Sequence, residues 1–116
     1  MNRGDVVIVE FPYTDGRRGK NRPAPVIQND RDNGRLANTV VAMMSGNTRH
    51  ANESTQVLID RAAPGGELSG LHGPSVVKCC NLFTVRQQDI LRTIGHLPNE
   101  MQKSVVKGLK DAIGLL

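Results

Sequence analysis

The chain contains no tryptophan, one tyrosine and two phenylalanines among its 116 residues. Its core must therefore be built from Val, Ile, Leu, Met and Ala, and it lacks the aromatic platform on which single-strand binding proteins stack bases. The two cysteines, Cys79 and Cys80, are adjacent, so a disulfide between them would be strained. Without a second cysteine pair a zinc site is not expected. No other metal or cofactor is expected either. Both cysteines are interpreted as small structural residues, with a reactive thiol as the alternative.

Long apolar runs are also missing. No stretch approaches the length of a membrane span, and the N-terminus enters a strand pattern without a signal peptide, so a cytoplasmic protein without a membrane partner is expected. Hydrophobic residues make up 38% and charged residues 22%, which indicates one globular domain, residues 1–116. Lys and Arg exceed Asp and Glu by 15 to 11, which favours an anionic partner, with nucleic acid ahead of acidic proteins or membrane surfaces.

Short β-branched runs between loops rich in glycine and proline predict a mainly β protein. The expected strands are Asp5–Phe11, a segment through residue 28 that begins as an edge or bulge at its two prolines, and residues 39–45, 55–59, 75–85 and 90–96. Residues 29–34 form a turn cluster, residues 61–74 an irregular connection, and residues 87–89 a short helical turn.

One clear helix is expected, from Pro98 and Asn99 to about Ile113. Its apolar residues recur at spacings of three and four, and Gly114 follows its last turn. Five to six strands and one helix predict the α+β class, as a small, strongly bent antiparallel sheet. The economical arrangement is a partly open SH3-like barrel with the C-terminal helix closing one side, and the exposed helix face and sheet edges favour a homodimer.

A basic loop over residues 15–23 lies between the first two strand patterns. Glycine permits close backbone approach and arginine offers a planar fork to phosphate, so Arg17, Arg18, Lys20 and Asn21 are candidate RNA-binding residues. A solvated hairpin tip is the alternative. Arg22 differs from the others, because Pro23 fixes the backbone where this loop meets the sheet.

A second polar cluster follows the strand at residues 39–45. Ser45 closes an apolar run, which places its hydroxyl at the rim of the sheet, although a serine at a strand end is also a common turn residue. Asn47, His50 and, further along, Asn81 complete the candidate RNA-binding set. His50 titrates in the range useful for catalysis, with a solvated loop histidine as the alternative.

Metal-independent cleavage of RNA suits such a set of residues. The 2′-hydroxyl attacks the adjacent phosphorus, which requires a proton acceptor, a proton donor to the leaving 5′-oxygen and positive charge on the phosphoryl oxygens. Arg22 can supply that charge through two parallel hydrogen bonds, and the other cations would make RNA binding salt-dependent.

Three segments in register resemble the MazF/PemK toxins: Arg3-Gly4-Asp5-Val6-Val7, the run from Asn21 to Asp30, and the strand ending Ala42-Met43-Met44-Ser45. The later residues 82–85, 96–97 and the terminal helix match elements of that family. The resemblance implies an SH3-like homodimeric barrel that is a metal-independent endoribonuclease. Such toxins cut single-stranded RNA to leave a 2′,3′-cyclic phosphate and a 5′-hydroxyl, and a cognate antitoxin covers their RNA groove.

The same resemblance implies roles for single residues. Arg22 corresponds to a catalytic arginine, and Ser45 stands where many members have threonine. A guanidinium is a poor base, so charge stabilisation is expected of Arg22, with proton delivery as an alternative, and the general base is unidentified. Phe83 departs from the basic or polar residues of some members, so base specificity is not carried over. A gyrase-poisoning toxin of the same fold and a plain RNA-binding module are the alternative functions.

Overall fold

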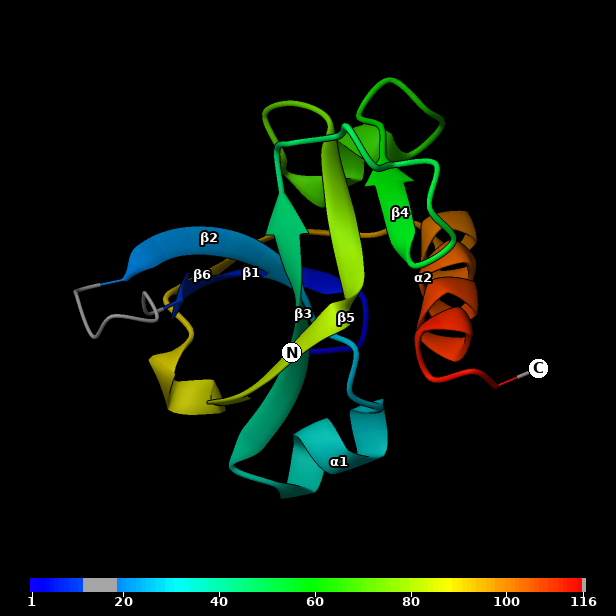
Figure 1. Cartoon of the computed structure of the whole chain (residues 1–116). Helices are drawn as coiled ribbons and strands as arrows, with labels where there is room; N and C mark the ends of the chain where they lie inside the picture. Colours follow the sequence, from blue (N-terminus) through cyan, green and yellow to red (C-terminus); the bar gives the residue numbers. More distant parts are fainter. Residues whose placement is uncertain (12–18, 116) are drawn as a thin grey trace.

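The computed structural model describes residues 1–11 and 19–115 (Figure 1). Its elements in chain order are β1 (Asp5–Phe11), β2 (Lys20–Pro25), α1 (Asp30–Arg35), β3 (Asn38–Ser45), β4 (Gln56–Ile59), the 3₁₀ turn η1 (Gly66–Ser69), β5 (Ser75–Arg86), the 3₁₀ turn η2 (Gln87–Asp89), β6 (Arg92–His96) and α2 (Asn99–Ala112). Within the described ranges, no helix has the length and apolar character needed to cross a membrane.

The strands form two antiparallel sheets of three strands each, in the orders β2-β1-β6 and β3-β5-β4. A bridge between Val26 and Val41 joins the sheets, and the amide of Ile27 donates to the carbonyl oxygen of Val40 at 2.9 Å. Helix α2 packs against β4 and β5 and closes that side of the molecule (Figure 1). The predicted α+β architecture, a bent SH3-like barrel with a C-terminal helix, is confirmed.

The prolines of β2 lie where the sequence predicts them, on an edge strand. Pro23 lies opposite Ile8 and Pro25 opposite Val6, and β2 has β1 as its partner on one side of its sheet. Proline lacks the N–H that a strand paired on both sides would need, which confines it to such an edge. The strand starts at Lys20, which pairs with Phe11, and it ends at Pro25 rather than at the predicted residue 28. Beyond Pro25 the chain leaves β1, and the amides of Ile27 and Gln28 donate to the carbonyl oxygen of Val40 on β3.

The turn predicted at residues 29–34 is instead helix α1, Asp30–Arg35. The Asn29 side chain accepts a hydrogen bond from the amide of Asp32 at 2.9 Å and so caps the first turn. Hydrogen bonds from Asn29 and then Arg35 hold the pKa of Asp32 below its usual value. Asn and Asp favour both turns and helix N-termini, so the same residues that indicate a turn here start a short helix.

The barrel has two hydrophobic clusters, on the two faces of β3. The first lies beneath α2 and consists of Val6, Ala42, Met44, Val57, Ile59, Leu71, Val77, Cys79, Leu97 and Val105. The second lies between the two sheets and consists of Val7, Val9, Phe11, Ala24, Val26 and Val41. Burying both faces of one strand explains why β3 reads as an almost continuous apolar run.

Strand β5 bends at an irregularity after Lys78. Its register with β3 passes from Met43 opposite Lys78 to Ala42 opposite Leu82, so residues 79–81 have no partner on β3. The extra residues turn the second half of β5 toward the second cluster, as bulges do. The Phe83 ring thereby packs edge-on against Phe11, with centroids 4.9 Å apart.

The two cysteines occupy opposite environments. Cys79 is buried in the first cluster and Cys80 is exposed, and both thiols are free. Burial, with a smaller contribution from Cys80, raises the pKa of Cys79 from 9.0 to about 11. The folded protein therefore keeps a proton that the unfolded chain releases, and the stability that Cys79 contributes is complete below pH 9.0 and is lost as pH rises toward 11.

We expect the free energy of unfolding, measured by urea denaturation, to fall more steeply between pH 9 and pH 10.5 in the wild type than in Cys79→Ala. Because the two proteins differ only at residue 79, the difference between the two slopes isolates the contribution of Cys79. Iodoacetamide at pH 8 should modify Cys80 alone in the native protein, and equal labelling of both cysteines would contradict the burial of Cys79.

Candidate functional site

Arg22 and Ser45 both continue the strand faces that bury the second cluster. On β2, Arg22 lies opposite Val9 and shares a face with the fully buried Ala24, because side chains alternate along a strand. On β3, Ser45 shares a face with Val41 in the same way. Since β2 and β3 are in contact, Arg22 and Ser45 extend two neighbouring strand faces beyond the buried residues of one cluster, which is called the open end of the second cluster below.

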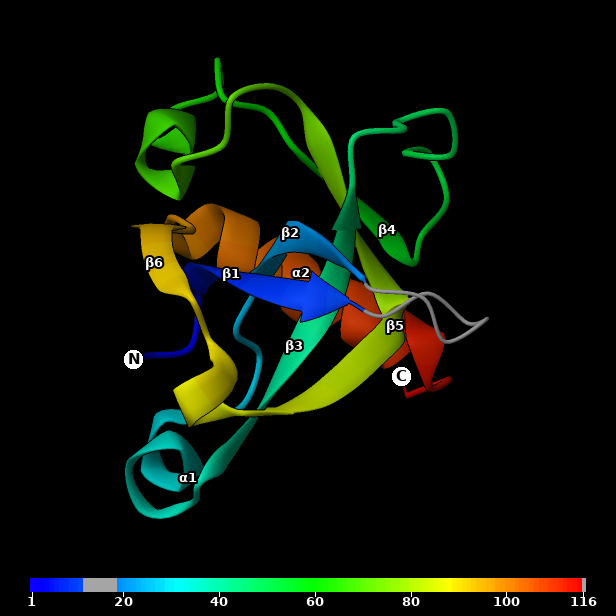
Figure 2. The same cartoon turned by 90° about the vertical axis from the view of Figure 1, so that its left-hand side faces the viewer.

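The residues that follow Arg22 and Ser45 meet at one depression. Pro23 and Gly46 both line a hollow of about 420 Å³, together with the loop from Gly70 to Ser75 and residues of β1 and β6. Figures 1 and 2 both show the C-terminal end of β3 passing beside β2 at this place. The structure therefore brings together the Arg22-Pro23 step and the Ser45-Gly46 step, which are far apart in the sequence.

The Arg22 guanidinium is available to a ligand. Its side chain is half-buried, and it makes no hydrogen bond or ion pair with any residue that the structure describes. A half-buried cation is costly without a counter-charge, and the planar fork of arginine matches the oxygens of a phosphate. This position can therefore hold an anionic group of the kind that RNA presents.

Ser45 is at once a turn residue and a rim hydroxyl. Its Oγ accepts a hydrogen bond from the amide of Asn47 at 3.1 Å, and the Asn47 side chain accepts one from the amide of Arg49 at 3.1 Å. These contacts fix the strand end and occupy an acceptor position of the Ser45 hydroxyl. The hydroxyl donates to none of the residues that the structure describes, so its hydrogen can donate to a ligand.

The other predicted residues fall into different places. Lys20 is exposed and shares the face of Arg22, whereas Asn21 is exposed on the opposite face of β2. Asn81 lies at the bulge of β5, where its amide nitrogen is 3.8 Å from the Met43 sulfur. Arg17 and Arg18 lie outside the described residues.

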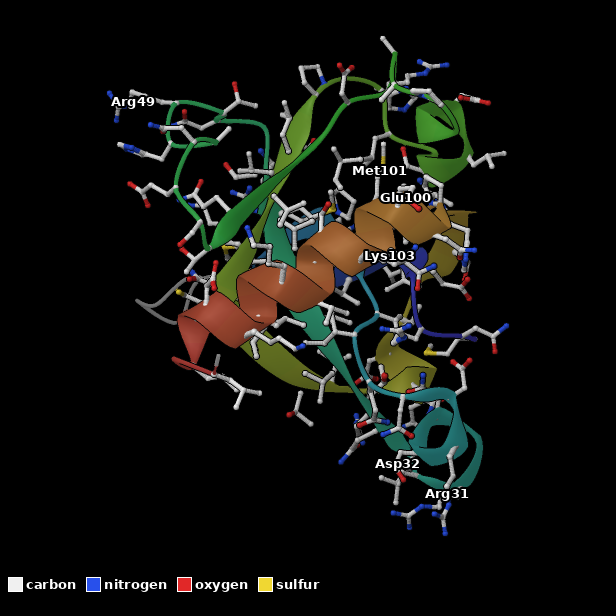
Figure 3. All side chains as sticks on the ribbon, turned by 90° about the vertical axis from the view of Figure 1, so that its right-hand side faces the viewer. Arg31, Asp32, Arg49, Glu100, Met101 and Lys103 are labelled. Carbon is white, nitrogen blue, oxygen red and sulfur yellow. The ribbon has the colours of Figure 1, made fainter. Side chains whose placement is uncertain are left out.

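Among the described residues, the His50 side chain makes no hydrogen bond to Arg22 or Ser45. It lies in an exposed turn, and its Nδ1 is 3.5 Å from a carboxylate oxygen of Glu53. Figure 3 shows the neighbouring Arg49 at the outer end of this loop, pointing away from the barrel. The exposed position of His50 agrees with the alternative interpretation, a solvated loop histidine.

One residue of this surface was not singled out from the sequence. Lys78 is half-buried in β5, opposite Met43 on β3 and Gln56 on β4. The signal for it was a single lysine within the apolar run of residues 76–80, directly before the two cysteines. Among the residues that the structure describes, no group of three or more His, Cys, Asp or Glu could hold a metal ion.

Comparison with known proteins gives a family for this chain. Residues 2–113 match the family described as PemK-like, MazF-like toxin of type II toxin-antitoxin system. The endoribonuclease EndoA of Bacillus subtilis (strain 168) is 30% identical over 117 residues, an alignment that covers 100% of this chain and 97% of that protein.

Solved structures support the same conclusion. The Mycobacterium tuberculosis toxin MazF-mt6 is 26% identical with a TM-score of 0.77, covering 97% of this chain and 98% of that one. A mycobacterial endoribonuclease in complex with its cognate antitoxin has a TM-score of 0.80 at 20% identity, covering 100% and 97%, which supports the fold alone. The resemblance read from Arg3-Gly4-Asp5 and the Arg22-Pro23 step is thus confirmed, and the chain belongs to the PemK-like, MazF-like toxins of type II toxin–antitoxin systems.

Proposed function

We propose that this toxin is a metal-independent endoribonuclease that cleaves single-stranded mRNA at short sequences and so inhibits translation and growth. The observation that carries the proposal is Arg22, a half-buried cation with no hydrogen bond or ion pair to any described residue, on the face of β2 that continues to the second cluster, as Ser45 does on β3. The 30% sequence identity to EndoA, which is named an endoribonuclease, supports the same activity.

The chemistry requires little covalent participation by the protein. The 2′-oxygen forms a bond to phosphorus while the bond from phosphorus to the 5′-oxygen breaks, which yields a 2′,3′-cyclic phosphate and a 5′-hydroxyl. Arg22 donates two hydrogen bonds to the non-bridging oxygens, where negative charge grows in the transition state. The Ser45 hydroxyl donates to the same phosphate and orients it. The proton of the 2′-hydroxyl leaves to a base that is not assigned, and the leaving 5′-oxygen gains one.

The proposal includes two protein partners, a cognate antitoxin and a second copy of the chain. The mycobacterial relative was solved with its cognate antitoxin, and exposed apolar side chains lie on the present molecule at the end of α2, with Ile113 73% and Leu115 56% exposed. Large exposed apolar side chains in one place mark surfaces that become buried in assemblies. A dimer mass in light scattering would support the homodimer, and a monomer at micromolar concentration would reject it.

The activity is tested by incubating purified protein with a defined single-stranded RNA in EDTA. We expect cleavage at short sites, with products that carry 2′,3′-cyclic phosphate and 5′-hydroxyl ends. Intact RNA would overturn the proposal. In that case, accumulation of gyrase–DNA breaks would identify a gyrase poison, and RNA binding without turnover would identify a binding module.

Ser45 offers a graded test of the site. We expect Ser45→Ala to lower kcat by about 10-fold to 100-fold, because a hydrogen bond to a charged group contributes about 1.5–3 kcal/mol. Ser45→Thr keeps the hydroxyl and should keep most of the activity. The readout is single-turnover cleavage of a labelled RNA, and equal losses in both variants would show that Ser45 matters for the turn rather than for the substrate.

A further inference from the structure

Lys78 is a cation in the central strand of a β-sheet, a position that neutral side chains usually occupy. It lies in the middle strand of the β3-β5-β4 sheet, with Met43 opposite on one side and Gln56 opposite on the other. Its side chain is half-buried and makes no hydrogen bond or ion pair with any described residue. Such a position costs solvation energy that no counter-charge of the described chain offsets.

Lys78 on β5 and Ser45 on β3 lie on the same face of the β3-β5-β4 sheet. Ser45 lies opposite Val76, and Lys78 is two residues further along β5, so the two are diagonal neighbours on one side of the sheet. Diagonal Cβ atoms on adjacent strands lie roughly 7–8 Å apart, within reach of a long side chain. Cys79, the next residue, turns to the other face and is buried in the first cluster.

The residues around Lys78 hold this part of the face in place. The register irregularity begins directly after it, and the Asn81 amide returns to contact the Met43 sulfur at 3.8 Å. Met43 thus has Lys78 opposite it and Asn81 beside it, two residues before Ser45. The polar groups on this face therefore extend from Ser45 along β5, away from Arg22 on β2.

We propose that Lys78 binds a backbone phosphate of the RNA next to the one that is cleaved. The inference rests on the proposed ribonuclease function, in which Arg22 and Ser45 hold the scissile phosphate. Arg22 lies on one side of Ser45, on β2, and Lys78 lies diagonally on the other side, on β5. The ammonium of Lys78 would therefore meet the RNA at a phosphate next to the scissile one. A lysine is a point charge on a flexible stem, which suits contact with a phosphate that undergoes no reaction.

The first test measures the salt dependence of RNA binding by Lys78→Gln, with Lys107→Gln as the matched control. Lys107 is exposed on α2, which packs on the other face of β5, and its replacement removes the same charge. We expect Lys78→Gln to bind a single-stranded RNA about 10-fold more weakly, and the slope of log K against log salt to fall by about 0.7. Lys107→Gln should leave the slope unchanged, and Lys78→Arg should restore it.

The second test locates the phosphate. A series of RNAs carries one neutral methylphosphonate each, at positions before or after the cleavage site. At one neighbouring position, we expect the neutral linkage to weaken binding by the wild type as much as the Lys78→Gln substitution weakens binding of the unmodified RNA. The same linkage should not weaken binding by Lys78→Gln any further. Additive losses at every position, or an unchanged slope in Lys78→Gln, would overturn the role of Lys78. Intact RNA with the wild type would instead overturn the ribonuclease itself, so the two failures are distinguishable.

Discussion

Replacement of Arg22 by alanine is expected to lower kcat/KM for single-stranded RNA by about 10²-fold to 10³-fold, the loss typical when one donor to a developing oxyanion is removed. The reason is that Arg22 is the half-buried cation at the open end of the second cluster and lacks any counter-charge among the described residues. The loss should fall mainly on kcat, since charge on the phosphoryl oxygens grows in the transition state.

Two further variants separate chemistry from general charge. Arg22→Lys keeps the charge but loses the fork, and we expect an intermediate rate. Lys20→Ala removes a cation from the exposed start of the same strand face, and its effect should stay within about 10-fold and should shrink as salt is added. Urea unfolding of Arg22→Ala should match that of the wild type. Cleavage at the wild-type rate by Arg22→Ala would contradict the assignment of the site.

Replacement of Gly95 by alanine is expected to lower the free energy of unfolding by about 3 kcal/mol, the upper part of the usual range for overpacking. Gly95 lies in β6 opposite Val6, and a Cβ at this position would fall onto the backbone of Leu68 and Ser69 in η1. Backbone atoms cannot rotate aside as a side chain can, so β6 or η1 must move.

Gly34 provides the matched control for Gly95. It lies in α1, where a Cβ would meet nothing within 4 Å, and its φ is not in the left-handed region. Gly34→Ala should therefore be neutral or stabilising by up to about 1 kcal/mol, because alanine is the better helix former. Chemical denaturation of both variants measures the difference, and equal effects at the two glycines would show that contact with η1 is not the cause.

Much of the fold was predictable because local chemistry and tertiary structure agree. The β-branched run Asp5–Phe11, the prolines of β2 and the spacing of apolar residues in α2 each act within a few residues. Residues 29–34 were predicted wrongly because their local signal has two outcomes. The difference was decided by Asn33, which is buried and accepts a hydrogen bond from the Thr39 hydroxyl at 2.6 Å. That contact joins α1 to β3 and is not visible in a turn pattern.

The sequence by itself determined the class of the protein, the order of its strands, its C-terminal helix and the two residues on which the proposed chemistry rests. Arg22 could be singled out because Pro23 fixes its backbone, and Ser45 because it ends an apolar run. Only the tertiary structure decided which side chains share a surface. That depends on the contact between β2 and β3 and on the bend of β5 after Lys78, both of which join residues distant in the chain. Pairing across such distances is set by how the two clusters are buried, so a lysine that looks like an interruption of a strand becomes a neighbour of Ser45.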